Sequence, residues 1–380
     1  MLALGMMSGT SMDGVDAALI DTDGVVIRGF GRAGYRAASA NEAAVLRGAL
    51  GRWPGEAGVA EATALSQAAH AALAADFPEA EVIGYHGQTF AHDPGGRGTH
   101  QAGSGAALAR AVHRPVVWDF RSEDVRQGGQ GAPLAPFFHH ACACWAVAAG
   151  HLDPAPVAFL NLGGVGNITV TDPRIAAPEA PGACLAFDTG PANAPIDDLI
   201  AARRHGPGRD EGGRIAASGR PDAGVLADFL AHDYFRRPPP KSLDRDAFAG
   251  LSAAVAALAL PDAAATLTHA VAASVAAGMR WLPQPPVRLL VCGGGRHNGA
   301  IMAALSAHLP GIGVAPVEQI GLDGDMLEAQ AFGWLAVRVL RGLPTSGPAT
   351  TGAPGPVCGG RISYPSVFTQ DAGTRVHPPR

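Results

Sequence analysis

The stretch that decides the fold is LALGMMSGTSMDGVDAALID, residues 2–21. An apolar run leads into a small polar loop, residues 8–14, and an alternating run leads out of it. This pattern predicts a strand, a glycine loop and a second strand. Gly9 and Gly14 allow a tight turn and a close approach to a ligand. Two interpretations stay open: the loop N–H groups form a cradle for a phosphate, or the loop is an ordinary hairpin turn.

Composition narrows the class of protein. The chain has 380 residues, of which 47% are hydrophobic and 16% charged, so we expect two domains with well-filled cores. A net charge of −5 and the lack of a dense Lys/Arg run argue against a nucleic-acid partner. No apolar run is long enough to span a membrane, and the N-terminus lacks the pattern of a signal peptide. Five scattered cysteines without zinc-ligand spacing indicate reduced thiols, as in the cytoplasm.

The opening pattern occurs a second time at residues 157–172, VAFLNLGGVGNITVTD. Here an apolar run again leads into a loop, which carries Gly163 and Gly164, and an alternating run follows. The same strand–loop–strand unit therefore stands at the start of each half of the chain. We infer two related α/β lobes, each of which presents a glycine loop to a shared cleft.

Polar segments follow two further predicted strands. HGQT, residues 86–89, follows a short buried strand at 81–85, and a strand at 116–120 delivers Asp119 and Arg121. Such strand ends are where ligands of α/β folds collect. The alternative for HGQT is a turn with a capped histidine. The alternative for the acidic and basic residues around 119–124 is a structural ion-pair network.

Two later segments also carry candidate chemistry. A strand at 184–187 ends in Asp188, which serves either as a general base or as a cap for the following helix. A strand at 287–291 runs into Gly293-Gly294-Gly295 and then a helix at 299–309. A strand, a glycine turn and a helix N-terminus in this order suit the docking of a phosphate.

Seven motifs in order carry a family resemblance: GMMSGTSMDGVDAALI, HGQT, DFRSEDVRQGGQGAPLAPFFH, NLGGVGNIT, FDTGPAN, CGGGRHN and LEAQAFGWLA. By these motifs the chain closely resembles the anhydro-N-acetylmuramic acid kinases of the actin/Hsp70/sugar-kinase superfamily, from residue 2 to about 340. The resemblance implies an α/β, two-lobed actin-like ATPase fold. Each lobe would be a ribonuclease-H-like mixed sheet flanked by helices, with the ligand cleft between the lobes.

The resemblance also implies an activity. ATP and Mg²⁺ would be the cofactors, and 1,6-anhydro-N-acetylmuramic acid the substrate. Water would open the anhydro ring while O6 is phosphorylated, which gives N-acetylmuramic acid 6-phosphate in peptidoglycan recycling. A cytoplasmic enzyme is expected, with a homodimer as the candidate assembly and with neither nucleic acid nor membrane as partner.

These implications define the expected domains and site. The N-terminal lobe would span residues 1–131 and the C-terminal lobe 132–340, with the segment from about 341 to 380 packed back on the first lobe. Asp188 is expected to be the catalytic base. The expected ATP contacts are Gly9, Thr10, Ser11, Met12, Asp13, Gly14, Val15, Asp16, Gly163, Gly164, Asn167, Gly293, Gly294, Gly295 and Asn298. The expected sugar contacts are His86, Gln88, Thr89, Asp119, Arg121, Gly190 and Glu328.

The chain differs from the usual sequence pattern of the superfamily at the expected metal site. Many members carry an acid just before the first glycine loop, where Met7 stands here, and Asn161 occupies the corresponding place before the second loop. The metal ligands are therefore left open, with Asp13 or Asp16 as candidates through water. In KSLDRDAF, residues 241–248, Leu243-Asp244 replaces the usual Thr-Gly, so ligand contacts by Lys241 and Arg245 stay open.

Other functions compete with this one. A related sugar or acid kinase would share the fold and differ in substrate. An ATP-switched chaperone or filament subunit is a second alternative, but no separate peptide-binding domain is recognisable after residue 340. A transcriptional regulator on the same core is disfavoured because no helix-turn-helix pattern precedes the first strand.

Overall fold

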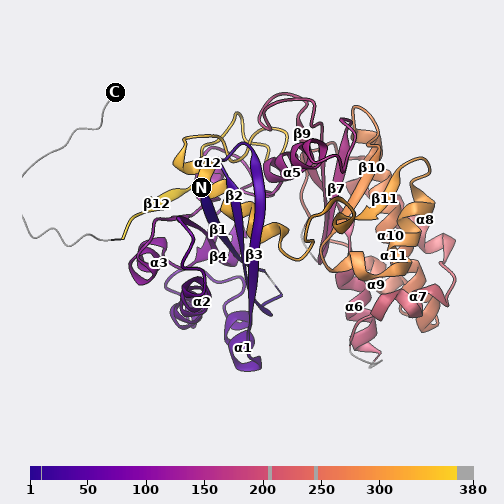
Figure 1. Ribbon diagram of the computed structural model, residues 1–380. Coiled ribbons are helices and arrows are strands. Elements are labelled where there is room, and N and C mark those ends of the chain that lie inside the picture. The colour runs from indigo at the N-terminus through magenta and orange to yellow at the C-terminus, as the bar shows by residue number, and fades with distance from the viewer. Residues whose placement is uncertain (10, 204–207, 244–246, 366–380) are drawn as a thin grey trace, which may run out of the picture.

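The protein is described by a computed structural model that covers residues 1–9, 11–203, 208–243 and 247–365. It contains two mixed β-sheets, each with helices packed on it, and the two sheets form separate lobes (Figure 1). Thr10, Asp244 and Arg245 lie outside the described residues. None of the helices in the described ranges is long and apolar enough to cross a membrane.

The first sheet has seven strands. Its main path runs β12-β6-β4-β1-β2-β3, and β5 pairs with β4 beside that path. β1, β2 and β3 form an antiparallel meander, whereas β4 and β6 run parallel to β1. The strand bounds are β1 Leu2–Ser8, β2 Gly14–Thr22, β3 Ile27–Ala37, β4 Val82–Asp93, β5 Gly98–Ala102, β6 Val116–Trp118 and β12 Arg361–Ser363.

The second sheet repeats this arrangement with five strands. Its order is β11-β10-β7-β8-β9, in which β7, β8 and β9 form the antiparallel meander and β10 and β11 continue parallel to β7. The strand bounds are β7 Val157–Leu162, β8 Val165–Thr171, β9 Cys184–Pro191, β10 Arg288–Cys292 and β11 Gly313–Pro316. The shared order confirms the predicted duplication and the predicted fold class of two ribonuclease-H-like lobes.

Helices form layers on and between the sheets. α2 and α3 pack on the outer face of the first sheet, and α6, α8, α10 and α11 build the outer core of the second. α5 and α12 share one apolar core with the inner faces of both sheets. The helix bounds are α1 Ala40–Gly48, α2 Val59–Ala75, α3 Gly105–Val112, α4 Ser122–Arg126, α5 Pro136–Ala148, α6 Asn193–Ala202, α7 Arg214–Ala217, α8 Ala223–Leu230, α9 Ala249–Ala254, α10 Leu260–Gly278, α11 Gly299–His308 and α12 Leu327–Leu340. Short 3₁₀ turns are η1 Glu211–Gly213, η2 Asp233–Arg236, η3 Met279–Trp281, η4 Gly294–His297 and η5 Val317–Ile320.

Two glycines bring α12 unusually close to the first sheet. A Cβ atom at Gly5 in β1 would lie 1.7 Å from the carbonyl oxygen of Ala329, and one at Gly84 in β4 would lie 2.0 Å from that of Phe332. Any side chain at either position would push the helix away. The predicted division of the chain at residues 131 and 340 stays a prediction, and α12, although assigned to the C-terminal lobe, packs against the N-terminal sheet.

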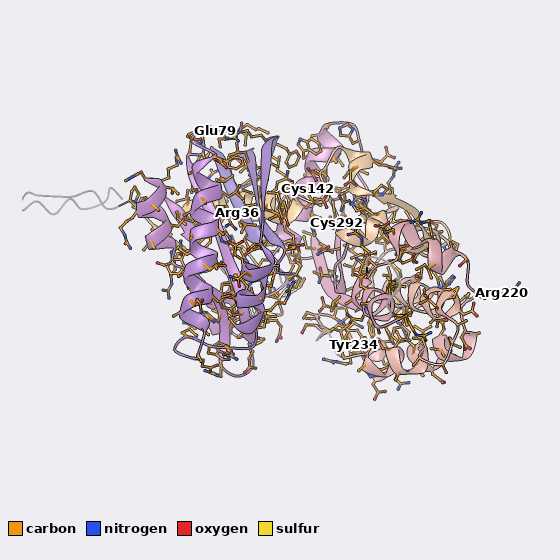
Figure 2. The ribbon with its side chains drawn as sticks, turned by 90° about the horizontal axis from the view of Figure 1, so that it is seen from below. Arg36, Glu79, Cys142, Arg220, Tyr234 and Cys292 are labelled. Atoms are coloured by element: carbon orange, nitrogen blue, oxygen red, sulfur yellow. The ribbon has the colours of Figure 1, made fainter. Side chains whose placement is uncertain are left out.

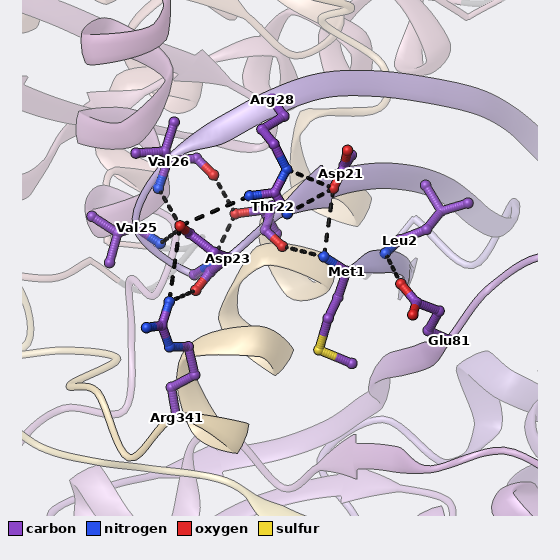
Figure 3. A network of polar contacts seen from close by, with 11 residues as sticks. Met1, Leu2, Asp21, Thr22, Asp23, Val25, Val26, Arg28, Glu81 and Arg341 are labelled. Atoms are coloured by element: carbon purple, nitrogen blue, oxygen red, sulfur yellow. Dashed lines mark hydrogen bonds and ion pairs between the residues drawn. The ribbon is translucent and has the colours of Figure 1, made fainter.

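Met1 is held at the end of the β1–β2 hairpin that lies opposite the glycine loop (Figure 3). The Met1 ammonium donates to the Thr22 carbonyl at 2.8 Å, and the Leu2 N–H donates to the Glu81 carboxylate at 2.5 Å. The Asp23 side chain accepts from the Val25 and Val26 N–H groups and closes the turn between β2 and β3. These contacts fix the end of β1 opposite the glycine loop.

Two strands are longer than the sequence predicts. The strand expected at 81–85 continues as β4 to Asp93, so HGQT lies within a strand and not after one. The strand expected at 184–187 continues as β9 to Pro191, so Asp188 also lies within a strand. Polar residues continue both strands because each has a pairing partner there, Ala102 for Gln88 and Asn167 for Asp188.

Candidate active site

The first glycine loop is anchored from beneath. The Met12 side chain is buried between α1, α2 and β4, with a left-handed φ of 58°. The Gln88 side chain donates to the Gly9 carbonyl at 3.0 Å, and the Tyr35 hydroxyl donates to the Asp13 carbonyl at 2.8 Å. A Cβ at Gly9 would meet no atom closer than 3.5 Å. Gly9, Met12 and Asp13 are thus held in place, while a side chain at Gly9 would meet open space.

The glycines of the second lobe divide into two kinds. A Cβ at Gly293 would lie 2.3 Å from Asn161 Oδ1, and one at Gly295 would lie 2.5 Å from Leu162 Cβ, so these two glycines make room for β7. At Gly163 nothing lies within 4 Å, and at Gly164 the nearest atom is 3.7 Å away. The β7–β8 loop therefore leaves space at its backbone, as an anion cradle requires.

Asn298 has a local structural task. Its side-chain oxygen accepts from the N–H groups of Ala300 and Ile301, both at 3.1 Å, and so caps α11. Its expected contact with ATP stays a prediction, as does that of Gly294, which is exposed in the turn before this helix.

A chain of polar side chains joins the two sheets. The Arg121 guanidinium donates to His86 Nε2 at 2.9 Å and to the Gly131 carbonyl at 2.7 Å. Asn161 Nδ2 at the end of β7 donates to Glu328 Oε1 at 3.2 Å, and Glu328 stands in the first turn of α12. Desolvation raises the pKa of the Glu328 carboxyl above its ordinary value, although the positive charge of Arg121 and the bond from Asn161 act to lower it. The Glu328 side chain is exposed to solvent.

Burial also shifts the pKa values of the other polar groups in this cluster. It lowers the pKa of Arg121 to about 10 and holds the pKa of His86 well below its ordinary value, so His86 is neutral near pH 7. Asp16 in β2 faces the same region. Desolvation, followed by the charges of Asp13 and Glu328, raises its pKa to about 7. Several perturbed groups close to one another are typical of a functional site.

Asp188 is held by two hydrogen bonds to its carboxylate. Asn167 Nδ2 donates to Oδ1 and the Leu243 N–H donates to Oδ2, both at 2.8 Å. Burial raises the pKa of this carboxyl above its ordinary value, while the two hydrogen bonds act to lower it. Each oxygen keeps a free lone pair, so the carboxylate is oriented and still able to accept a proton.

The sheet register connects Asp188 to the first cluster. Asn161 pairs with Asn167, and Asn167 pairs with Asp188, so the three side chains stand in one row on one face of the second sheet. Adjacent strands lie about 5 Å apart, so this row spans about 10 Å. The row leads from Glu328 to Asp188 and brings the two groups to one edge of the site.

Three expected sugar contacts lie outside this cluster. Asp119 accepts from Ser122 and pairs with Arg361 of β12 at 3.0 Å. Thr89 accepts from Gln101 at 3.2 Å. A Cβ at Gly190 would lie 2.6 Å from Ser274, so this glycine lets α10 approach β9. Their roles as ligand contacts stay predictions.

Sequence analysis missed two groups that hold Asp188. One is the Leu243 N–H, a backbone donor that no side-chain pattern reveals. The other is Tyr234, whose hydroxyl donates to the Asp188 carbonyl at 2.5 Å. Figure 2 shows Tyr234 in the lobe of the second sheet. The aromatic run Tyr234-Phe235 after α8 was the only signal in the sequence.

The arrangement suits the transfer of a phosphoryl group. Each lobe has one glycine loop with open space at a glycine, and loops of this kind bind phosphate oxygens in phosphoryl-transfer enzymes. A neutral histidine, an arginine and two carboxylates, His86, Arg121, Glu328 and Asp16, lie near one another, and a separate carboxylate, Asp188, is held by two hydrogen bonds. Among the described residues, no three His, Cys, Asp or Glu side chains converge closely enough to hold a metal by themselves.

Fold and site together define a two-lobed sugar kinase with an actin-like ATPase fold, which uses ATP. A family model described as anhydro-N-acetylmuramic acid kinase matches residues 1–365. The chain belongs to this family. It is 66% identical over 366 residues to the anhydro-N-acetylmuramic acid kinase of Cereibacter sphaeroides, an alignment that covers 96% of this chain and 97% of the relative. With the protein of the same name from Ruegeria sp. (strain TM1040) it shares 56% identity over 367 residues, which is 97% of this chain and 96% of the relative.

Solved structures resemble the chain more distantly. A ROK family glucokinase from Streptomyces griseus, in complex with glucose and AMPPNP, aligns with a TM-score of 0.40 and 15% identity, over 88% of this chain and 98% of the glucokinase. The fold assignment therefore rests on the repeated strand order described above.

Proposed function

We propose that the enzyme cleaves the 1,6-anhydro ring of 1,6-anhydro-N-acetylmuramic acid with water and transfers the γ-phosphoryl group of ATP to O6. The products are N-acetylmuramic acid 6-phosphate and ADP, and the role is peptidoglycan recycling. Support comes from membership in the family, from relatives of that name over nearly the whole chain, and from the geometry around Asp188.

The chemistry of the substrate explains why a base is needed. O6 of the anhydro sugar is an ether oxygen and carries no proton, so it is a poor nucleophile. Asp188 accepts a proton from water as the water oxygen attacks C1. The C1–O6 bond breaks, and its electrons stay on O6, which attacks the γ-phosphorus and displaces ADP. The proton on Asp188 later leaves to solvent.

The observation that best supports this proposal is that two hydrogen bonds hold the Asp188 carboxylate in one orientation. Its two oxygens are fixed by Asn167 and Leu243, and burial raises the pKa of the carboxyl. A fixed carboxylate with a raised pKa is a stronger proton acceptor than an ordinary surface aspartate. A helix cap, the alternative for Asp188, is disfavoured because the residue lies within β9 and its carboxylate meets no N–H group of α6.

The remaining groups suit substrate and nucleotide. The backbone of the two glycine loops would bind phosphate oxygens, and His86 with Arg121 would bind the sugar. Mg²⁺, when bound, would neutralise charge on the phosphates. Asp16 fits such a cation through water, because its partly buried carboxyl lies within electrostatic reach of Asp13 and Glu328. Location in the cytoplasm and assembly as a homodimer stay predictions.

Isotope labelling tests the coupled ring opening. The enzyme is incubated with Mg-ATP and the anhydro sugar in ¹⁸O-water and quenched within a few turnovers. We expect one ¹⁸O at C1 of a 6-phosphorylated product and none in its phosphate. Because a free anomeric hydroxyl exchanges with water, unlabelled product held in ¹⁸O-water for the same time is the control. Label in the phosphate, or phosphorylation only of ordinary hydroxyl-bearing sugars, would overturn the proposal.

A further inference from the structure

A segment that begins in η2 and continues beyond it makes several contacts with the candidate base. We call residues 234–243, which run from η2 towards α9, the strap. Three bonds join the strap to Asp188. The Tyr234 hydroxyl donates to the Asp188 carbonyl, and the Asp188 N–H donates to the Lys241 carbonyl at 3.0 Å. The Leu243 N–H donates to the Asp188 carboxylate at 2.8 Å. The strap therefore holds both the backbone and the side chain of one residue.

Lys241 is buried beneath this strap. Its ammonium donates to the Tyr234 carbonyl at 3.1 Å and lies 4.3 Å from the centre of the Tyr234 ring. The rings of Phe187 and Trp281 lie 5.7 and 5.8 Å away. No carboxylate pairs with it among the described residues. Desolvation, with the charges of Arg280 and Arg237, accordingly lowers the pKa of Lys241 to about 8.

A buried lysine is costly, and a hydrophobic residue of similar size would fill this aromatic site at a lower cost. What the lysine adds is a bond that closes the strap. Its side chain ties the Tyr234 end to the Lys241 end, and these two ends bear the groups that hold Asp188. We call this bond from the Lys241 ammonium to the Tyr234 carbonyl the brace. The Leu243 N–H comes only two residues after Lys241, so its position depends on the brace.

We propose that Lys241 is a positioning residue for the base, which acts by bracing the strap so that the Leu243 N–H stays bonded to the Asp188 carboxylate. The inference rests on the proposed role of Asp188. Lys241 does not touch the reacting atoms. The bond from Leu243 does not depend on its side chain, because a backbone N–H of any residue other than proline makes it.

The brace has a consequence for the pH profile. Asn167 and the Leu243 N–H face the Asp188 carboxylate, and Tyr234 is the titratable neighbour; Arg237 and Arg280 face Lys241. The Leu243 hydrogen bond favours the charged carboxylate. A looser bond raises the pKa of Asp188, and the base must be deprotonated to act. The acid limb of kcat must therefore move to higher pH when the brace is lost.

Three variants test the inference. Lys241→Met keeps an apolar stem of similar length and removes the donor, Lys241→Arg keeps a donor, and Tyr234→Phe removes the hydroxyl bond to Asp188. The matched control is Arg114→Met, which removes a 2.9 Å bond from an exposed side chain to the Pro78 carbonyl in the other lobe. For each, kcat, the KM for ATP and the pH profile of kcat are measured, with circular dichroism as the check of folding.

For Lys241→Met we expect kcat to fall about tenfold, a modest share of what a positioned base contributes. The acid limb should move to higher pH and the KM for ATP should change less than about twofold. Lys241→Arg should recover part of kcat, and Tyr234→Phe should move the acid limb in the same direction. If Lys241→Met fails to fold, Tyr234→Phe and Lys241→Arg carry the test.

A lowered melting temperature with an unmoved acid limb in Lys241→Met and Tyr234→Phe would overturn the inference and leave a purely structural lysine. Asp188→Asn separates this outcome from failure of the proposed function. Full turnover by Asp188→Asn would show that Asp188 is not the base and would overturn the proposed function. If Asp188→Asn loses turnover but the acid limb of kcat stays in place in Lys241→Met and Tyr234→Phe, only the positioning role of Lys241 is rejected.

Discussion

At Asp188, burial and hydrogen bonding act on the carboxyl in opposite directions. Burial raises its pKa, whereas the bonds from Asn167 and Leu243 favour the charged form. The result is a carboxylate that is held in one orientation and has a pKa above 3.8, the ordinary value for aspartate. This combination keeps the carboxylate in one orientation while burial favours its uptake of a proton.

Replacing this carboxylate should abolish its function as a base without disturbing its shape. We expect Asp188→Asn to lower kcat by about 10²–10⁴-fold, the usual contribution of general-base catalysis. The affinity for ATP should be nearly unchanged, because the glycine loops are untouched. Single-turnover kinetics and calorimetric titration of ATP check both, with the exposed Asp153→Asn as control. Turnover near that of the wild type would contradict the assignment.

The backbone at Gly9 is open on the side that a phosphate would approach. In Gly9→Val the branched side chain would fill that space, so we expect ATP to bind about tenfold more weakly or worse, which is ~1.4 kcal/mol. Gly29→Val in β3, where a Cβ meets nothing within 4 Å, is the control. Unchanged affinity for ATP in Gly9→Val, measured by calorimetry, would count against the cradle.

At the scale of elements, α12 is the helix that places Glu328 opposite the second sheet. Its first turn carries Glu328, and its approach to β1 and β4 sets where that side chain lies. The approach depends on Gly5 and Gly84, where a Cβ would overlap carbonyl oxygens of the helix. Sheet glycines, remote from any ligand, thus determine a position in the site.

Gly84→Ala tests this packing. We expect a loss of about 1–3 kcal/mol in the free energy of unfolding, because the overlap is with backbone that cannot rotate away. The rate of turnover should fall as well, since Glu328 moves with the helix. Urea unfolding followed by fluorescence measures the first effect. Gly29→Ala is the control, and equal stability of the two variants would argue that the helix is free to shift.

For the whole molecule, Arg338 connects the two lobes. It stands on α12, is buried, and pairs with Glu179 of the β8–β9 connection at 2.8 Å. The same guanidinium donates to the Gly24 carbonyl at 3.0 Å in the turn between β2 and β3. One side chain therefore joins α12, the first sheet and the second lobe.

Losing this group should weaken the contact between the lobes. Arg338→Met is expected to lower the free energy of unfolding by about 3–5 kcal/mol, the usual cost of breaking a buried pair. Glu179→Gln should cost less, because Glu179 is partly exposed and its amide can still accept a bond. Arg126→Met, which breaks an exposed pair with Glu123, should cost about 0–1 kcal/mol. A double-mutant cycle in urea isolates the pair, and equal losses in all three variants would contradict its special role.

Much of the fold follows from local sequence patterns. The two strand–glycine–strand units, and the order of strands and helices around them, depend on hydrophobic period and on glycine position, both of which are visible in a few adjacent residues. They predicted the duplicated lobes, which the strand order confirms, and seven ordered motifs predicted the family, which the comparisons confirm. The ends of β4 and β9 were predicted wrongly, because pairing with a distant strand continued each one through polar residues.

The sequence by itself determined which residue types are available for chemistry, Asp188, Arg121 and Glu328 among them. Only the tertiary structure decided how they are held. The row from Asn161 to Asp188 exists because strand register aligns residues from three strands, and the N–H that orients Asp188 comes from a strap more than fifty positions later. The loop at residues 8–14 is defined locally, but its anchor at Gln88 comes from a neighbouring strand. Register and loop closure depend on the packing of the whole chain, and no local pattern encodes them.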